Sequence, residues 1–266
     1  MGIKFEKWQG LGNDFIILTD TDATPELAVK MCDRKFGIGA DGIFSPVKSN
    51  KADIGWKFYN SDGTSAQMCG NGIRCFAKFV KKHNLTDKNK FSVETLAGII
   101  TPEILDNGNV KVDMGSPVLE PSKIPALVDS SLSTIVQGFE ATLVSMGNPH
   151  CIIFCDEDAE IMAKSYGSSI ETDKIFPEKT NVEFVNIVSE NKVRVNVWER
   201  GCGITLACGT GACATVVAGV NRKLISENTE VVLPGGSLNI FYNKAGDNHV
   251  YMQGPAQFVF SGEFEE

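Results

Sequence analysis

Apolar residues recur along this 266-residue chain in short runs that Gly, Asn, Asp and Pro interrupt. Runs rich in Val, Ile, Phe and Tyr predict strands, whereas longer segments with helical spacing predict helices. The predicted strands are Phe15–Leu18, Ile54–Tyr59, Ile152–Phe154, Val182–Val188, Val193–Trp198, Val231–Leu233, Leu238–Tyr242 and Gln257–Phe260. The predicted helices are Pro25–Lys35, Gly72–Lys82, Asp158–Tyr166 and Gly211–Val220, the last of them apolar on every face and therefore buried.

Two segments of the sequence resemble each other. The segment FYNSDGTSAQMCGNGIRCFAKFV around Cys69 resembles VWERGCGITLACGTGACATVV around Cys208, at an offset of 139 residues. GNDF before an apolar run and GNPH before CIIF form a second ordered match at an offset of 135. We infer a duplicated half, each a curved, largely antiparallel sheet around one central helix, with the proline-containing segment Gly115–Thr134 as the linker.

Charge and cysteine content narrow the functional classes. The net charge is −8 and no Lys/Arg-rich stripe stands out, so we expect no nucleic-acid partner. Neither a signal peptide nor a membrane span is recognisable, which favours a cytoplasmic protein without a membrane partner. The eight cysteines include no C-x-x-C pair and the three histidines are dispersed, so thiols are expected and a metal site is not.

Each C-G-x-G sequence lies at the predicted start of a buried helix. The first N–H groups of a helix lack partners within the helix, and its dipole places partial positive charge there. A cysteine at this position has a stabilised thiolate, and the free N–H groups can bind a carboxylate. Two such starts facing each other would form one cavity with two activated thiols.

Inversion at the α-carbon of an amino acid needs a base on one face and an acid on the other. A thiolate and a thiol meet this need and exchange roles when the reaction reverses. We therefore predict that Cys69 and Cys208 form a two-base pair. The remaining cysteines are interpreted as small buried side chains.

Further polar residues lie at the ends of apolar strands. Arg200 is suited to clamping a carboxylate, Glu199 and the asparagines to holding an ammonium group, and His150 either to tuning a thiol or to a structural role. The segment from Gly37 to Gly42 matches G-x-G-x-x-G, but a helix precedes it and a strand follows, which excludes a dinucleotide site. The residues of this group are Asn13, Asn60, Asn148, His150, Asn181, Glu199 and Arg200.

The chain resembles the diaminopimelate epimerase family through GLGNDF, GIGADG, FYNSDGT-x-x-x-MCGNG-x-R, GNPH, TNVEF and ERG-x-G-x-T-x-ACGTGA. The resemblance implies an α+β fold with two pseudosymmetric lobes, 1–115 joined by strand 255–266 and 116–254, and an active site in the cleft between them. It implies epimerisation of LL- to meso-diaminopimelate in lysine and peptidoglycan precursor biosynthesis, without pyridoxal phosphate or metal, by a homodimer.

The same resemblance assigns residue roles. Cys69 and Cys208 would be the two-base pair, and the distal amino-acid group would be held by Asn13, Asn60, Asn148, Asn181, Glu199 and Arg200. The carboxylate at the reacting carbon would bind to Gly70, Asn71, Gly209 and Thr210.

The chain departs from the family at some positions, and an alternative function remains to be considered. Many members carry Gln at position 42, where this chain has Gly, and Cys202 precedes Cys208 closely enough to raise the hypothesis of thiol oxidation. The alternative function is a two-thiol racemase of proline, hydroxyproline or another single amino acid. The ERG segment and the four asparagines argue against it, because a one-ended substrate does not need a distal clamp.

Overall fold

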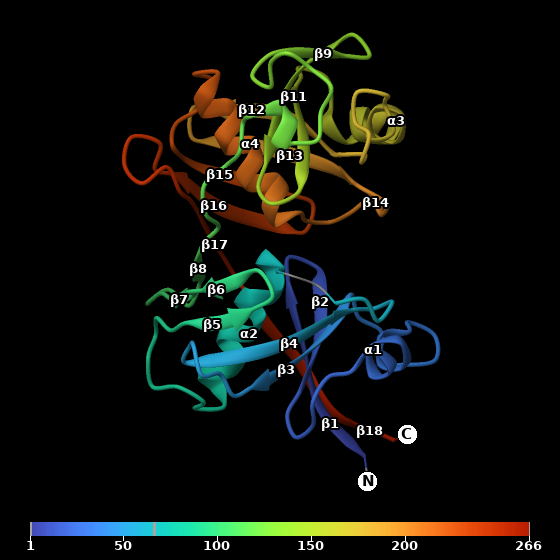
Figure 1. The fold of residues 1–266 in the computed structure, drawn as a ribbon, viewed down its shortest axis with the longest axis vertical. Helices are drawn as coiled ribbons and strands as arrows, with labels where there is room; N and C mark the ends of the chain where they lie inside the picture. Colours follow the sequence, from blue (N-terminus) through green and yellow to red (C-terminus); the bar gives the residue numbers. More distant parts are fainter. Residues whose placement is uncertain (1, 66–67, 266) are drawn as a thin grey trace. The chain divides into compact units, whose positions relative to one another are not determined.

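The computed structural model describes residues 2–65 and 68–265, whose contacts divide the chain into two compact units (Figure 1). The first unit ends at Val112 and resumes at Gly254, and the second runs from Asp113 to Gln253. Each unit is built on its own sheet, so the two are described in turn.

The sheet of the first unit has the strand order β18-β1-β2-β3-β4-β5-β6. Neighbouring strands are antiparallel except for the parallel pairs β2–β3 and β4–β5. A short hairpin, β7–β8, follows β6 in the chain. The strands of this sheet are β1 Ile3–Gly10, β2 Asn13–Leu18, β3 Gly42–Val47, β4 Ile54–Asn60, β5 Val93–Thr95, β6 Gly98–Ile100 and β18 Gln257–Phe264. The hairpin, which is not part of this sheet, consists of β7 Glu103–Ile104 and β8 Val110–Asp113.

Helices cover both faces of this sheet. Ile16 and Leu18 of β2 belong to the same buried cluster as Met31 of α1 (Pro25–Cys32). On the opposite face Phe44 contacts Phe15 at 4.9 Å between ring centroids and also Phe76 of α2 (Gly70–Lys82) at 6.3 Å. The central strands are therefore buried on both sides, which explains their continuous apolar runs.

The sheet of the second unit has the order β17-β16-β15-β13-β12-β11-β10-β9, with β14 paired to β13. The pairs β11–β12 and β13–β15 are parallel, and the other pairs of this path are antiparallel. The strands are β9 Thr134–Val136, β10 Phe139–Ser145, β11 Pro149–Phe154, β12 Asn181–Ser189, β13 Lys192–Glu199, β14 Gly203–Ile204, β15 Asn228–Leu233, β16 Gly236–Tyr242 and β17 Val250–Gly254.

This sheet also carries a helix on each face. Met162 of α3 (Ala159–Glu171) packs in one buried cluster with Ile153 and Phe184. The almost entirely apolar α4 (Gly209–Asn221) packs against β10, β11, β12 and β16. The order β2-α1-β3-β4-α2-β5 thus recurs as β11-α3-β12-β13-α4-β15 with the same strand directions, apart from the small β14, and confirms the duplication and the α+β class.

The bounds of several elements differ from those predicted. Helix α1 ends at Cys32 rather than Lys35, because the Asp33 carboxylate accepts the N–H groups of Lys35 and Phe36 and turns the chain. Helix α3 continues to Glu171, beyond the predicted end at Tyr166. The predicted linker is packed rather than loose: it contains the 3-10 turn η1 (Pro121–Lys123), and Ile124 is buried in the core of the second unit.

Candidate active site

Cys69 caps the N-terminus of α2. Its backbone is extended, helix α2 begins at Gly70, and the Sγ atom accepts the N–H of Gly72 at 3.4 Å. A Cβ on Gly72 would lie 2.5 Å from Cζ of Phe44, so glycine is needed for the helix to approach the sheet here. The first turn of α2 is buried and brings the thiol and the free N–H groups of a helix start together.

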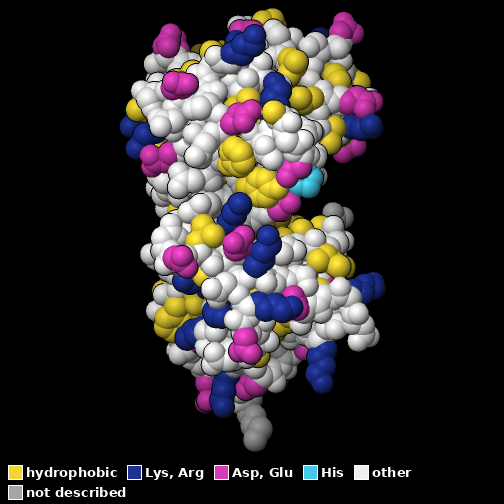
Figure 2. Space-filling model, turned by 90° about the vertical axis from the view of Figure 1, so that its left-hand side faces the viewer, with side chains coloured by type: hydrophobic (Ala, Val, Ile, Leu, Met, Phe, Trp, Pro, Cys, Tyr) yellow, Lys and Arg dark blue, Asp and Glu magenta, His cyan; other side chains and the backbone are white. Residues whose placement is uncertain are grey.

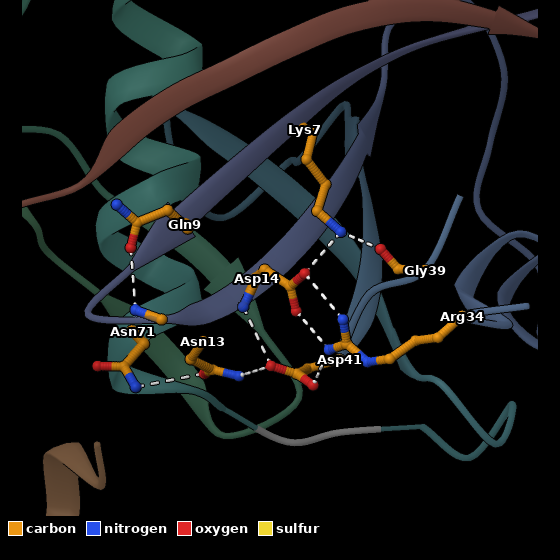
Figure 3. A network of polar contacts seen from close by, with 9 residues as sticks. Lys7, Gln9, Asn13, Asp14, Arg34, Gly39, Asp41 and Asn71 are labelled. Atoms are coloured by element: carbon orange, nitrogen blue, oxygen red, sulfur yellow. Dashed lines mark hydrogen bonds and ion pairs between the residues drawn. The ribbon is translucent and has the colours of Figure 1, made fainter. Parts of the chain in front are cut away.

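An amide side chain contacts this thiol. Oδ1 of Asn13 lies 3.6 Å from Sγ of Cys69. The same oxygen accepts Nδ2 of Asn71 at 3.2 Å (Figure 3). Nδ2 of Asn13 donates in turn to Oδ2 of Asp41 at 2.6 Å. Asp41 therefore fixes which way the Asn13 amide faces and directs its oxygen toward Cys69.

Asp41 belongs to a charged network behind Asn13 (Figure 3). Arg34 forms ion pairs of 2.7 Å with both Asp14 and Asp41, and the buried Lys7 forms one of 2.7 Å with Asp14 and donates to the carbonyl of Gly39. Burial alone would raise the pKa of Asp14, but its bonds with Arg34 and Lys7 lower it below its ordinary value. The network holds β2 against the loop that precedes β3.

Cys208 caps α4 in the same way. Its backbone is extended, and Sγ accepts the N–H of Gly211 at 3.4 Å and lies 3.4 Å from Oγ1 of Thr210. A Cβ on Gly211 would lie 2.5 Å from Oε1 of Glu183. Both copies of C-G-x-G therefore form the cysteine-capped helix start that their spacing predicted.

The neighbours of the two caps differ in chemistry. In the second unit Nδ1 of His150 lies 2.7 Å from Oε1 of Glu183, both side chains are fully buried, and Nε2 of His150 lies 3.1 Å from Oδ1 of Asn148. Ligand atoms of His150, Glu183 and Cys208 all lie within 4.8 Å of one another. The thiol of the second unit therefore borders a buried polar pair.

Burial and carboxylates control the protonation of this thiol. Burial, reinforced by the nearby Glu199 and Glu183, raises the pKa of Cys208 well above its ordinary value. Burial also raises the pKa of Glu199, against the hydrogen bond that it accepts from Thr205. Negative charge is thus disfavoured around Cys208, and its thiol form is stabilised.

The loop that follows β13 is held in place by side chains from other strands and from α3. Oδ1 of Asn181 accepts the N–H of Arg200 at 2.9 Å, and the buried Glu171 accepts the N–H of Gly201 at 2.9 Å. The guanidinium of Arg200 donates to the carbonyl of Glu178 at 3.1 Å. Asn181 therefore positions the Arg200 backbone, a role that was not foreseen.

The structure gathers the expected residues within each unit. Asn13 and Asn60, at the start of β2 and the end of β4, lie on strands that flank β3 in the first unit. Asn148, His150, Asn181, Glu199 and Arg200 mark the corresponding ends of β11, β12 and β13 in the second. Gly70, Asn71, Gly209 and Thr210 form the first turns of α2 and α4.

Two residues near the caps had no predicted role, namely Asp41 and Glu183. Each lies inside a motif that was recognised, GIGADG and TNVEF, and Glu183 interrupts an apolar strand, which was an available indication of a buried charge. Gly42, where the family often has Gln, is tightly enclosed: a Cβ there would lie 2.7 Å from Cε2 of Phe58. Any side chain at position 42 would require Phe58 to move.

The family model described as diaminopimelate epimerase matches residues 5–120 and 142–259. The "Diaminopimelate epimerase" of Carboxydothermus hydrogenoformans is 51% identical, over 98% of this chain and 99% of its own length. The chain belongs to the diaminopimelate epimerase family. Both cysteine-capped helix starts lie within the ranges that this family model matches.

More distant solved structures share the fold of this diaminopimelate epimerase family member. A phenazine biosynthesis protein of the PhzF family from Bacillus anthracis aligns with a TM-score of 0.75 at 15% identity, over all of both chains. A hydroxyproline epimerase from Agrobacterium vitis, with bound trans-4-hydroxy-L-proline, aligns with a TM-score of 0.66 at 13% identity, over 98% of this chain and 92% of that one.

Two observations concern the surface. On the face shown in Figure 2, Lys and Arg side chains are interspersed with Asp and Glu. Among the helices of the described residues, none is long and apolar enough to cross a membrane.

Proposed function

We propose that the protein is a cofactor-independent isomerase that interconverts LL-2,6-diaminopimelate and meso-diaminopimelate. The observation that carries the proposal is the repeated cysteine-capped helix start, Cys69 on α2 and Cys208 on α4. Full-length similarity to curated diaminopimelate epimerases supports the choice of substrate.

In this mechanism one sulfur, as thiolate, removes the α-proton, and the other, as thiol, delivers its own proton to the opposite face of the same carbon. One C–H bond breaks and another forms, so the carbon is inverted and the two sulfurs exchange protonation states. The negative charge that develops next to the α-carboxylate is stabilised by N–H donors and partial positive charge at a helix start. Gly70, Asn71, Gly209 and Thr210 are proposed to supply these donors.

The distal half of the substrate carries a second ammonium and a second carboxylate. We assign its recognition to the polar side chains at the strand ends: Asn13, Asn60, Asn148, Asn181, Glu199 and Arg200. Amide oxygens and Glu199 suit an ammonium group, and the Arg200 guanidinium suits a carboxylate. His150 supports the second cap through Glu183.

We further propose that the protein acts as a homodimer in the cytoplasm. The C-terminal strand β18 is the edge of its sheet and exposes Phe258, Val259 and Phe260 by 42–50%, an apolar edge that a second copy would cover. The chemistry needs Cys69 and Cys208 as free thiols, which a reducing compartment maintains.

Exchange of the α-proton in D₂O tests the reaction. Reduced protein without added cofactor is mixed separately with LL-diaminopimelate, proline and lysine, and NMR follows loss of the α-proton signal. Exchange with diaminopimelate alone is expected. Exchange only with proline would replace the proposal by the single-amino-acid racemase, and no exchange with any of the three would overturn it.

Variants test the assignment of the pair. Cys69→Ala and Cys208→Ala should each retain less than about a tenth of wild-type epimerisation, since each removes one of the two acid/base groups. The exposed Cys202 provides the matched control, and Cys202→Ala should retain full activity. Circular dichroism establishes that each variant is folded.

A further inference from the structure

His150, Glu183 and Cys208 form a compact cluster inside the second unit. One ligand atom from each lies within 4.8 Å of the other two, and the three residues are 0%, 0% and 5% exposed. They come from β11, β12 and the N-cap of α4, elements that pack on one another, so the fold itself sets their spacing. The donors are an imidazole, a carboxylate and a thiol.

One oxygen of this cluster lacks a hydrogen-bond partner. Oε1 of Glu183 is bonded to Nδ1 of His150, whereas Oε2 is buried and has no hydrogen-bond partner among the described residues. Buried carboxylate oxygens are normally paired, because leaving one unsatisfied is costly. This oxygen is therefore available as a metal ligand in a residue that clusters with a thiol and an imidazole.

The donor types suit a cation. The carboxylate of Glu183, the imidazole of His150 and Sγ of Cys208 lie together in one buried cluster. A carboxylate in such a place attracts a divalent ion. The same position of the first unit has no such donors, because there Phe15 and Phe44 occupy the places of His150 and Glu183.

We propose that His150, Glu183 and Cys208 form a binding site for a thiophilic divalent cation, Zn²⁺ in the first instance, and that its occupation inhibits the enzyme by sequestering Cys208. Thiolate, imidazole and carboxylate are the donors that Zn²⁺ takes, and three protein ligands leave a fourth position for water. On binding, the Sγ–H bond breaks, the proton leaves to solvent and an Sγ–Zn bond forms. The inhibition rests on the proposed function, whereas the binding does not.

A further contact would orient the histidine. If Nδ1 of His150, which now faces Glu183, binds the ion, Nε2 keeps Oδ1 of Asn148 as its partner. Such partners orient a ligating histidine. Ligands of a tetrahedral zinc ion are separated by roughly 3.5 Å, so binding would draw the cluster together slightly.

Binding is measured first, without reference to catalysis. Metal-free, reduced protein is titrated with Cd²⁺, whose thiolate charge-transfer band reports the sulfur, and with Zn²⁺ by equilibrium dialysis. We expect one ion per chain with the band present, no band in Cys208→Ser, and affinity weakened by about tenfold or more in Glu183→Gln and in His150→Gln.

Controls separate this site from other thiols. Cys202→Ser, which alters an exposed thiol outside the site, and Cys69→Ser should both bind as the wild type does. Loss of the ion in either variant, or unchanged affinity in folded Glu183→Gln and His150→Gln, would overturn the proposed ligand set. Circular dichroism excludes unfolding as the cause of a loss.

Inhibition is measured next by α-proton exchange with diaminopimelate. Occupation of the site should abolish exchange in step with the cadmium band, and a chelator should restore it. Exchange that persists in the loaded protein would overturn the inhibitory role. Metal binding in a protein that never catalyses exchange would overturn the proposed function and leave the metal site standing.

Discussion

The effect of replacing Gly211 on the free energy of unfolding can be estimated from the structure. In Gly211→Ala, the new Cβ would lie 2.5 Å from Oε1 and 3.2 Å from Cδ of Glu183. The helix start cannot move away easily, because the N–H of Gly211 is bonded to Sγ of Cys208. The Glu183 carboxylate must therefore shift, and it is the same oxygen that holds His150 at 2.7 Å.

The size of the effect follows from two opposing contributions. Weakening a buried hydrogen bond to a charged group costs about 1.5–3 kcal/mol. Alanine in place of glycine in a helix increases the free energy of unfolding by about 1 kcal/mol. We expect Gly211→Ala to lower the free energy of unfolding by about 0.5–2 kcal/mol, which corresponds to a fall in Tm of roughly 1–8 °C for a chain of this size.

A double-mutant cycle isolates the cause. Urea unfolding followed by circular dichroism is measured for Gly211→Ala in the wild type and in Glu183→Ala, where the clashing carboxylate is absent. In the second background the substitution should be neutral or stabilising by up to about 1 kcal/mol. Gly72→Ala, whose Cβ meets the Phe44 ring at 2.5 Å instead, is the matched control and should cost the same in both backgrounds. Equal costs of Gly211→Ala in both backgrounds would refute the reasoning.

Three further predictions concern other parts of the chain. Asp41→Ala removes the oxygen that orients the Asn13 amide and should lower kcat/KM about tenfold, through both KM and kcat. Asp41→Asn should recover part of this loss, and unchanged kinetics in Asp41→Ala would contradict the prediction. The hydrogen bond with the Asp113 carboxylate raises the pKa of His249. The pair therefore stabilises the fold fully at pH values below the pKa of an unfolded histidine, and this stabilisation is lost as the pH rises through the raised pKa of His249. The urea midpoint of Asp113→Asn should therefore differ from the wild type more at about pH 5.5 than at about pH 9. Val259→Asp should shift the protein from dimer to monomer in analytical ultracentrifugation, and an unchanged dimer would place the interface elsewhere.

The elements that could be predicted from sequence are those whose pattern is local. The apolar run Phe15–Leu18 of β2 and most of the apolar helix α4 are buried, so hydrophobicity alone was enough to predict them. Strand β1 was missed because it mixes charged residues with apolar ones. Glu6 and Lys7 in it are buried, yet each is paired with residues distant in sequence. Periodicity cannot anticipate a charge that a distant partner neutralises.

The same distinction applies to the candidate site. A cysteine cap is a contact between residues three apart, so the C-G-x-G spacing predicted it correctly. The contacts of Asp41 with Asn13 and of Glu183 with His150 join residues 28 and 33 apart, and neither was anticipated. Arg200 was chosen for its side chain, whereas in this structure its backbone N–H is what Asn181 holds.

The duplication explains why two similar caps can perform opposite tasks. Phe44 and Glu183 are separated by 139 residues, the offset between Cys69 and Cys208, and each contacts the glycine three residues after its cysteine. Their partners Phe15 and His150 are likewise equivalent, being paired across a parallel strand pair with Gly42 and Asn181. An aromatic pair behind the first cap thus corresponds to a buried, hydrogen-bonded histidine–glutamate pair behind the second. A two-base reaction needs one sulfur protonated and the other not, and identical surroundings would give no preference. Burial and the carboxylates around Cys208 raise the pKa of that thiol, whereas the first cap has an aromatic pair at the equivalent positions.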